Sequence, residues 1–298
     1  MNKNLIAIVV VAGFTTPVAA IAADAKVFGR IQAAYTSLSV DNSKTADFTK
    51  IEDDYGMSRV GFTISEDVGY GLTMIGTLEW KFDPAQIDGT FDEREQYIGL
   101  KGGFGELRLG INTSPYKTAG GVKLDPWTAT AMEGRSTAKG INTKGGLSRA
   151  DLTGLGQSGH VPQTITYYSP EVNNFSGAIM LHVNGGDLSD STTATGAALA
   201  DALADYKSQE RNNTYSVAVN WKNNNLWVFA AQSSDQCNSL TTTVSAGTTT
   251  ASCKDASLTK LGAQWKMGPH KVGAQYEMDS GGASTAVSDQ TRTLGFGT

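Results

Sequence analysis

Few residues in this chain are of the types that do covalent chemistry, and they lie far apart. A Gly-x-Ser-x-Gly motif, a cysteine–histidine pair and a phosphate-binding glycine loop are absent from the sequence. The histidines lack the short spacings that join metal ligands or place a base beside a nucleophile. They are His160, His182 and His270. We therefore expect no catalytic residues, no metal site and no cofactor.

Charged residues suggest a different chemistry, electrostatic action on passing solutes. Three arginines fall in segments that alternate polar and apolar residues: Arg30, Arg59 and Arg108. Three acidic residues fall in the long segment 112–163: Asp125, Glu133 and Asp151. A charged wall opposite a charged loop creates a field across a water-filled space, and such a field sorts solutes by size and charge. These six residues are our candidates for such a charged wall and loop.

The sign of that field is left open by the sequence. The segment 112–163 also carries more basic residues than acidic ones: Lys117, Lys123, Arg135, Lys139, Lys144 and Arg149. The wall arginines could equally be structural, pairing with glutamates on the same face such as Glu79 or Glu106. Ion selectivity is therefore not predicted.

The chain has 2 cysteines, Cys237 and Cys253, and both fall in the segment 234–256, which we interpret as a long loop. In an exported protein such a pair favours a disulfide. Closing a loop of this size contributes roughly 3 kcal/mol in the chain-entropy description. We predict a structural disulfide without a catalytic role.

The N-terminus has the pattern of a secretory signal peptide. Lys3 supplies a positive charge, Leu5–Phe14 an apolar core, and Ala20-Ile21-Ala22 a small-residue cleavage site. We assign residues 1–22 to this signal and 23–298 to the mature domain. Loss of Lys3 changes the formal charge from −5 to −6. This mild acidity gives no support to nucleic-acid binding.

The mature chain alternates apolar and polar residues as strands with two different faces do. Around 58–65, Val60, Phe62 and Ile64 alternate with Arg59, Thr63 and Ser65. We expect about twelve strands, near 26–39, 57–66, 72–82, 93–101, 105–112, 163–169, 175–183, 213–221, 225–233, 257–267, 270–279 and 291–298. The last of these is shorter than a spanning strand of roughly 9–11 residues. Either the barrel is small and imperfectly closed or the chain is a fragment, and we expect a fragment.

The connectors alternate short and long, which separates a membrane barrel from a soluble sheet. The short connectors are Glu66–Gly71, Gly102–Gly105, Pro170–Asn174, Lys222–Asn225 and Gly268–Pro269. The long ones run through 40–57, 82–93, 112–163, 184–212, 234–256 and 280–290. Outer-membrane barrels place tight turns at one end and long loops at the other. Aromatic residues at strand ends fit interface girdles: Trp80, Tyr97, Tyr167, Tyr215, Trp221, Trp265 and Tyr276. We predict an all-β fold, a transmembrane antiparallel β-barrel.

With the strands placed, the chain resembles the Gram-negative general porins, a family of trimeric outer-membrane diffusion channels. The motifs that carry the resemblance are Phe28-Gly29-Arg30, Ser58-Arg59-Val60-Gly61-Phe62 with the turn Glu66–Leu72, the hairpin Tyr97–Gly105, and Tyr167-Tyr168-Ser169-Pro170. They cover about 28–177. The second half of the chain matches the family only in its alternation of strands with short and long connectors. Two features depart from the family pattern: Ile111-Asn112 replaces an expected arginine, and a terminal phenylalanine is missing.

The resemblance implies sixteen strands, a homotrimer in the outer membrane of a Gram-negative bacterium, and the segment 112–163 folded inward as the constriction loop. The implied partners are outer-membrane lipids, ions and small hydrophilic solutes. A secreted soluble adhesin or glycan-binding module is the alternative, because alternation alone also fits a soluble sandwich. A barrel-borne enzyme is a third hypothesis, and the scattered histidines offer it little.

Overall fold

The computed structural model of the chain describes residues 24–38, 48–52, 58–85, 91–120, 123–124, 160–183, 192–194, 215–245, 248–280 and 290–297. Within these ranges the fold is almost entirely β. Its elements are β1 (Asp24–Arg30), β2 (Ala34–Leu38), β3 (Phe48–Glu52), β4 (Arg59–Gly69), β5 (Leu72–Lys81), β6 (Asp92–Gly102), β7 (Gly105–Thr113), α1 (Pro115–Thr118), β8 (His160–Tyr168), β9 (Phe175–His182), β10 (Thr192–Ala194), β11 (Tyr215–Lys222), β12 (Leu226–Ser245), β13 (Thr248–Met267), β14 (His270–Ser280) and β15 (Gln290–Gly297).

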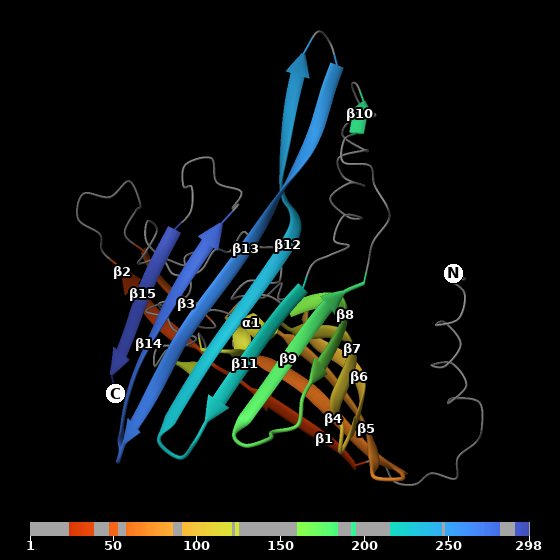
Figure 1. The fold of residues 1–298 in the computed structure, drawn as a ribbon, viewed down its shortest axis with the longest axis vertical. Helices are drawn as coiled ribbons and strands as arrows, with labels where there is room; N and C mark the ends of the chain where they lie inside the picture. Colours follow the sequence, from red (N-terminus) through yellow and green to blue (C-terminus); the bar gives the residue numbers. More distant parts are fainter. Residues whose placement is uncertain are drawn as a thin grey trace.

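The strands form one long antiparallel sheet. Its path runs β1-β4-β5-β6-β7-β8-β9-β11-β12-β13-β14-β15, while β10 pairs with β13 off this path and β2 pairs with β3 separately. Figure 1 shows that the sheet curls, so that β11–β14 lie on one side of α1 and β1, β4 and β5 on the other. The twelve strands of this path confirm the number expected from the sequence.

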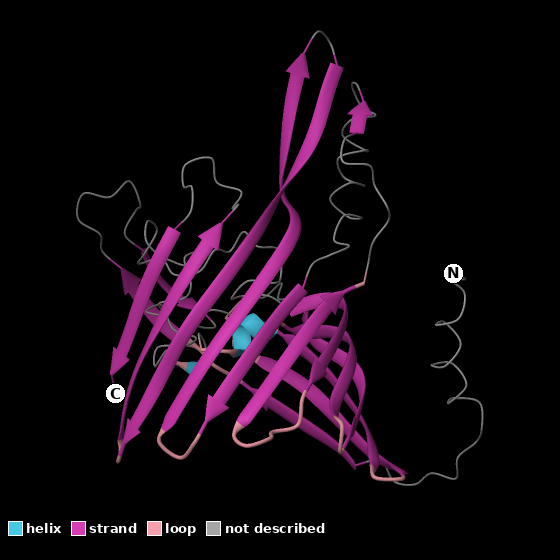
Figure 2. Ribbon diagram, viewed as in Figure 1, coloured by secondary structure: helices cyan, strands magenta, loops and turns pink. Residues whose placement is uncertain are grey.

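All five predicted short connectors are confirmed as turns between neighbouring antiparallel strands. In Figure 2 they gather at one end of the sheet, where β4 meets β5, β6 meets β7, and β13 meets β14. Gly69 and Gly71 have positive φ angles of 84° and 74° in the first of these turns. Glycine adopts this backbone conformation without steric cost, which is why the turn can be so tight.

Two predicted boundaries are wrong. The segment 26–39 is not one strand, because Ser58 interrupts the ladder. Its Oγ accepts from the Gln32 amide at 2.9 Å and donates to the Gln32 carbonyl at 3.0 Å, so β2 leaves the sheet and pairs with β3. The segment 234–256 is not a loop, because β12 and β13 continue their ladder to Ser245↔Thr248. Its Ser- and Thr-rich composition hid this long hairpin, which projects beyond the other strands in Figure 1.

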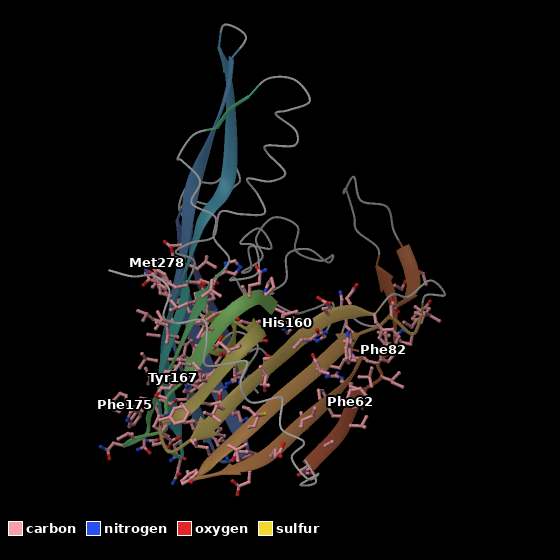
Figure 3. The ribbon with its side chains drawn as sticks, turned by 90° about the vertical axis from the view of Figure 1, so that its right-hand side faces the viewer. Phe62, Phe82, His160, Tyr167, Phe175 and Met278 are labelled. Atoms are coloured by element: carbon pink, nitrogen blue, oxygen red, sulfur yellow. The ribbon has the colours of Figure 1, made fainter. Side chains whose placement is uncertain are left out.

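The distribution of buried and exposed side chains in this sheet is the inverse of that in a water-soluble protein. On the outer face Phe62, Val219 and Trp265 are 42%, 50% and 55% exposed, and many other large apolar side chains join them. On the inner face Lys260, Glu277 and Thr166 are 0%, 4% and 0% exposed. Phe62, Phe175 and Met278, all from the outer face, are labelled in Figure 3. A sheet with an apolar outside and a polar inside has its favourable environment in a lipid bilayer.

The outer face also carries aromatic residues near the short turns. Phe175 packs on Trp221 with ring centroids 6.5 Å apart, and Trp265 lies two residues before the turn-side end of β13. These positions agree with a girdle at one membrane interface. Among the described residues, no helix has the length and apolar character needed to cross a membrane.

Candidate functional site

The long segment after β7 turns into the hollow of the curled sheet. Asn112 and Thr113 still belong to β7 and residues 160–163 to β8, so the connection is shorter at both ends than the predicted 112–163. At its start the Ser114 hydroxyl accepts a hydrogen bond from the Lys117 amide at 3.2 Å, and Pro115 opens the helical turn α1. A side-chain cap followed by proline is a strong local signal for a helix start. This turn directs the chain inward.

Tyr116 anchors the start of the loop to the opposite wall. Its side chain is fully buried, and its backbone amide donates to the Ser216 hydroxyl of β11 at 2.9 Å. The phenol donates to Glu277 Oε1 on β14, and the Lys260 ammonium of β13 lies 4.1 Å from the ring centroid. Three strands of the far wall therefore hold one residue of the loop, β11 through its backbone amide and β13 and β14 through its side chain. We call Tyr116, Ser216, Lys260 and Glu277 the loop anchor.

Apolar contacts surround the loop anchor. Tyr116, Ala119 and Leu124 form one buried cluster with inner-face residues of the wall: Ala218, Phe229, Ala231 and Leu258. An inward phenylalanine or leucine is out of place in a water-filled barrel, unless another part of the chain covers it. The loop start provides that cover. Residues 114–120 and Leu124 thus occupy part of the hollow.

Glycines on the wall leave room for the loop, which gives a direct prediction. At Gly273 a Cβ atom would lie 2.4 Å from Leu124 Cδ1 and 3.1 Å from the Ala263 carbonyl oxygen. We expect Gly273→Ala to push Leu124 off the wall and to lower stability by about 1–3 kcal/mol through overpacking. Thermal unfolding in detergent measures the change. Gly177→Ala is the matched control, because its Cβ would meet nothing closer than 3.4 Å. Equal stability of both variants would contradict the packing of Leu124 on β14.

A basic cluster lies on the wall formed by β1, β4, β5 and β6. Arg30 and Arg59 are directly opposite in the β1–β4 ladder. Arg59 Nε lies 3.6 Å from Glu79 Oε2, while Arg94 donates from Nε to Glu79 Oε1. Arg30 donates to the uncharged side chain of Gln32. The structure therefore brings together two of the three predicted wall arginines and adds Arg94. Arg94 was missed because a register shift near Leu78 and Trp80 changes the alternation on β6.

Arg108, the third predicted wall arginine, lies apart from this cluster on β7. Its Nε donates to Glu106, and its guanidinium carbon lies 4.2 Å from the Tyr97 ring centroid and 4.6 Å from that of Tyr168. The alternative that wall arginines pair with Glu79 or Glu106 is thus confirmed for Arg59 and Arg108. The prediction that Tyr97 belongs to an outer girdle is wrong, because it faces inward with Arg108 and lies opposite the buried Thr77.

The remaining predicted site residues are not tested by the structure. The acidic loop candidates Asp125, Glu133 and Asp151 lie outside the described residues. Cys237 and Cys253 lie on the backbone of the long hairpin, but their side chains are not described. Cys253 is opposite Leu240, and Cys237 falls within the irregularity between Asp235 and Ser239. In the described part of the chain, no group of three or more His, Cys, Asp or Glu could hold a metal ion.

A curled antiparallel sheet with an apolar outside, a polar hollow and short turns at one end defines an outer-membrane β-barrel protein. The sequence profile of the Gram-negative porins matches residues 7–297, and the chain belongs to that family. Its location is therefore the outer membrane of a Gram-negative bacterium.

Relatives and solved structures agree with this assignment. The major outer membrane protein P.IB of Neisseria meningitidis serogroup B is 31% identical over 233 residues, covering 76% of this chain and 57% of the relative. The P.IB protein of Neisseria gonorrhoeae is 30% identical over 184 residues, covering 60% and 47%. The chain spans about half the length of these relatives. The anion-selective porin of Comamonas acidovorans, at 17% identity, shares the fold with a TM-score of 0.59, covering 91% of this chain and 72% of that one.

Proposed function

We propose that the protein forms a water-filled channel for passive diffusion of ions and small hydrophilic solutes across the outer membrane. The observation that carries this proposal is the loop start, residues 114–120 with Leu124, which lies inside a polar hollow and is anchored to its far wall. A barrel wall of this width leaves an aqueous space that side chains alone do not fill. A loop fixed across that space narrows it without closing it.

The charged wall gives the channel its electrostatic character. Arg59 and Arg94 share the carboxylate of Glu79, and Arg30 lies opposite Arg59 in the β1–β4 ladder, so these four residues together carry a positive charge. We propose that Arg30 and Arg59 act on permeating solutes from this wall, with Arg94 beside them. Asp125, Glu133 and Asp151 remain the proposed loop side of the constriction. Arg108 is paired with Glu106 and contributes little net charge.

We also propose that the protein assembles as a homotrimer and has no enzymatic activity. Family membership supports a homotrimer surrounded by outer-membrane lipids. It also supports a channel without enzymatic activity, and no feature of the site favours the adhesin alternative. Nucleic acid has no role in this account.

A liposome swelling assay tests the proposed channel directly. Purified full-length chain in liposomes should admit small sugars and exclude large oligosaccharides, with rates that fall steadily as solute size rises. Heat-denatured protein at the same concentration is the control. Liposomes that admit no sugar with natively folded protein would overturn the proposal.

We propose that Cys237 and Cys253 form a disulfide at the point where the long hairpin leaves the barrel. The three residues between Asp235 and Ser239 face a single residue of β13, and a crosslink there would fix this irregular pairing. Native protein should therefore react with a maleimide reagent only after reduction. Reduction of the disulfide should lower the free energy of unfolding by about 2–4 kcal/mol. Labelling of two thiols without reduction would contradict the disulfide.

A further inference from the structure

A β-bulge interrupts the ladder between β7 and β8 on the loop side of the wall. The register shifts between Gly110 and Asn112, so that one residue of β7 faces two residues of β8, Pro162 and Gln163. Proline offers no amide to a ladder, and within sheets it is found at positions such as this one. Gln163 has a positive φ of 54°, a conformation that persists in a residue with a side chain only where the surrounding structure holds it. The bulge is therefore a fixed feature of the wall.

Hydrogen bonds hold the bulge in place from two sides. The Thr164 hydroxyl donates to the Gly110 carbonyl of β7 at 2.9 Å. The Val183 amide, one residue after the end of β9, donates to the Gln163 carbonyl at 2.9 Å. Gly110 itself contributes only backbone, because a Cβ atom there would lie 2.3 Å from the Gln96 carbonyl oxygen. The backbone around the bulge is thus constrained, and no side chain covers it at Gly110.

This arrangement leaves a groove of about 370 Å³ on the outer face of the wall. Its apolar lining comes from Leu109, Ile165 and Val183, and Gln163 adds an exposed amide side chain. Ile165 and Val183 are 37% and 57% exposed, and Ile165 is the ladder partner of the outward Leu181. The groove therefore opens toward the bilayer and not toward the polar hollow. Its volume lies at the lower end of the range of small-molecule sites, about 300–1,000 Å³, which suits a segment of a chain.

We infer that the groove binds one acyl chain of an ester-linked lipid, an inference that goes beyond the proposed channel and depends on the outer-membrane location alone. An apolar lining that faced the hydrocarbon region without contacts would forfeit dispersion attraction. Lipid chains are the flexible apolar groups that the bilayer supplies there. The amide of Gln163 can donate to the ester carbonyl at the head of the same chain. The groove thus joins an apolar slot to one polar group, as an ester-linked chain does.

The place of the groove along the strands assigns it to the outer leaflet. Outer-membrane barrels place their long loops outside the cell and their short turns in the periplasm. In Figure 3, His160 and Tyr167 lie near the loop end and the turn end of β8. Gln163 is closer in sequence to His160, and Val183 follows the loop end of β9. The amide therefore lies on the side of the outer-leaflet head groups, and the chain extends from it toward Ile165.

The test is native mass spectrometry of the full chain in dodecyl maltoside, with dimyristoylphosphatidylcholine as the probe. We expect one lipid per chain to survive activation that strips every other lipid. Val183→Phe and Ile165→Phe each add volume to the lining, so each should weaken this binding about tenfold or more. Ile179→Phe is the matched control, because Ile179 is 41% exposed on the same face of β9 but does not line the groove.

A second comparison isolates the amide. Gln163→Met keeps an unbranched side chain but removes the donor, so it should weaken binding of the ester lipid about fivefold, the ratio that one hydrogen bond provides. The ether analogue of the probe, with the same two chains, should bind the unchanged protein about fivefold more weakly than the ester does. It should bind Gln163→Met as well as it binds the unchanged protein.

The outcomes keep the groove and the channel apart. Loss of the retained lipid in Val183→Phe and Ile165→Phe, but not in Ile179→Phe, would support the groove. Equal retention in all three variants, or no lipid that resists stripping from the unchanged protein, would overturn it. A structure in lipid nanodiscs with a side chain of a second copy in the groove would overturn it as well. Retained lipid without current in a planar bilayer would overturn the channel and keep the groove, and current without retained lipid would do the reverse.

Discussion

Tyr116→Ala should release the start of the constricting loop from the far wall and produce the largest change of any single substitution here. Removing a fully buried aromatic side chain costs about 3–5 kcal/mol, because it leaves a cavity and unpaired partners. Lys260 would lose the aromatic ring beneath its ammonium group, and Glu277 would lose the phenol that donates to it. Single-channel recording should show a noisier current and altered conductance, while thermal unfolding in detergent reports the lost stability.

Tyr116→Phe separates the hydrogen bond from the packing. This variant keeps the ring over Lys260 but loses the phenol that donates to Glu277. The expected loss is about 1–3 kcal/mol, smaller than for alanine, with a current close to that of the unchanged protein. Wild-type conductance, noise and stability in Tyr116→Ala would show that the loop is held by other parts of the chain, and the loop anchor would then be wrong.

Glu79→Gln should change ion selectivity more than any other wall substitution. Its carboxylate lies 3.6 Å from Arg59 and also accepts a hydrogen bond from Arg94. Neutralising it leaves both arginines without this counter-charge. The ratio of anion to cation permeability should rise, and the reversal potential in a salt gradient measures the shift. Stability should fall by about 1–3 kcal/mol, since a charge-assisted hydrogen bond becomes a neutral one.

Glu171→Gln is the matched control for charge. It removes one carboxylate from an exposed position in the turn between β8 and β9, away from the basic cluster. The reversal potential should then move much less than in Glu79→Gln. Equal shifts in both variants would mean that overall charge, and not the wall at β4–β6, sets the selectivity.

The faces of the strands could be predicted from sequence because a residue period of two is enforced by the membrane on one side and water on the other. Val60, Phe62 and Ile64 could not face a polar hollow, so Arg59 had to. The five short turns could also be predicted from the sequence, because glycine, proline and asparagine concentrate where the backbone must reverse direction.

Prediction failed where tertiary contacts override the local pattern. The error at Tyr97 is of another kind: its amphipathic ring suits an interface, but the period of two on β6 places it inward beside Arg108, since the neighbouring Ile98 is exposed on the outer face. The end of β1 at Arg30 depends on the hydrogen bonds between Gln32 and Ser58, a residue far along the chain. The loop anchor joins Tyr116 to Glu277 across 161 residues. No local period predicts such a contact, although the inward Phe229 and Leu258 were a signal that something must cover them.

Single-channel recording of the full chain in a planar bilayer, with a salt gradient across it, tests the central claim most directly. An aqueous porin should insert in discrete steps of large, ohmic conductance, grouped in threes if the assembly is a homotrimer. Its reversal potential should indicate a preference set by the basic cluster. Natively folded protein that inserts into the bilayer and carries no current would contradict the account of a water-filled channel.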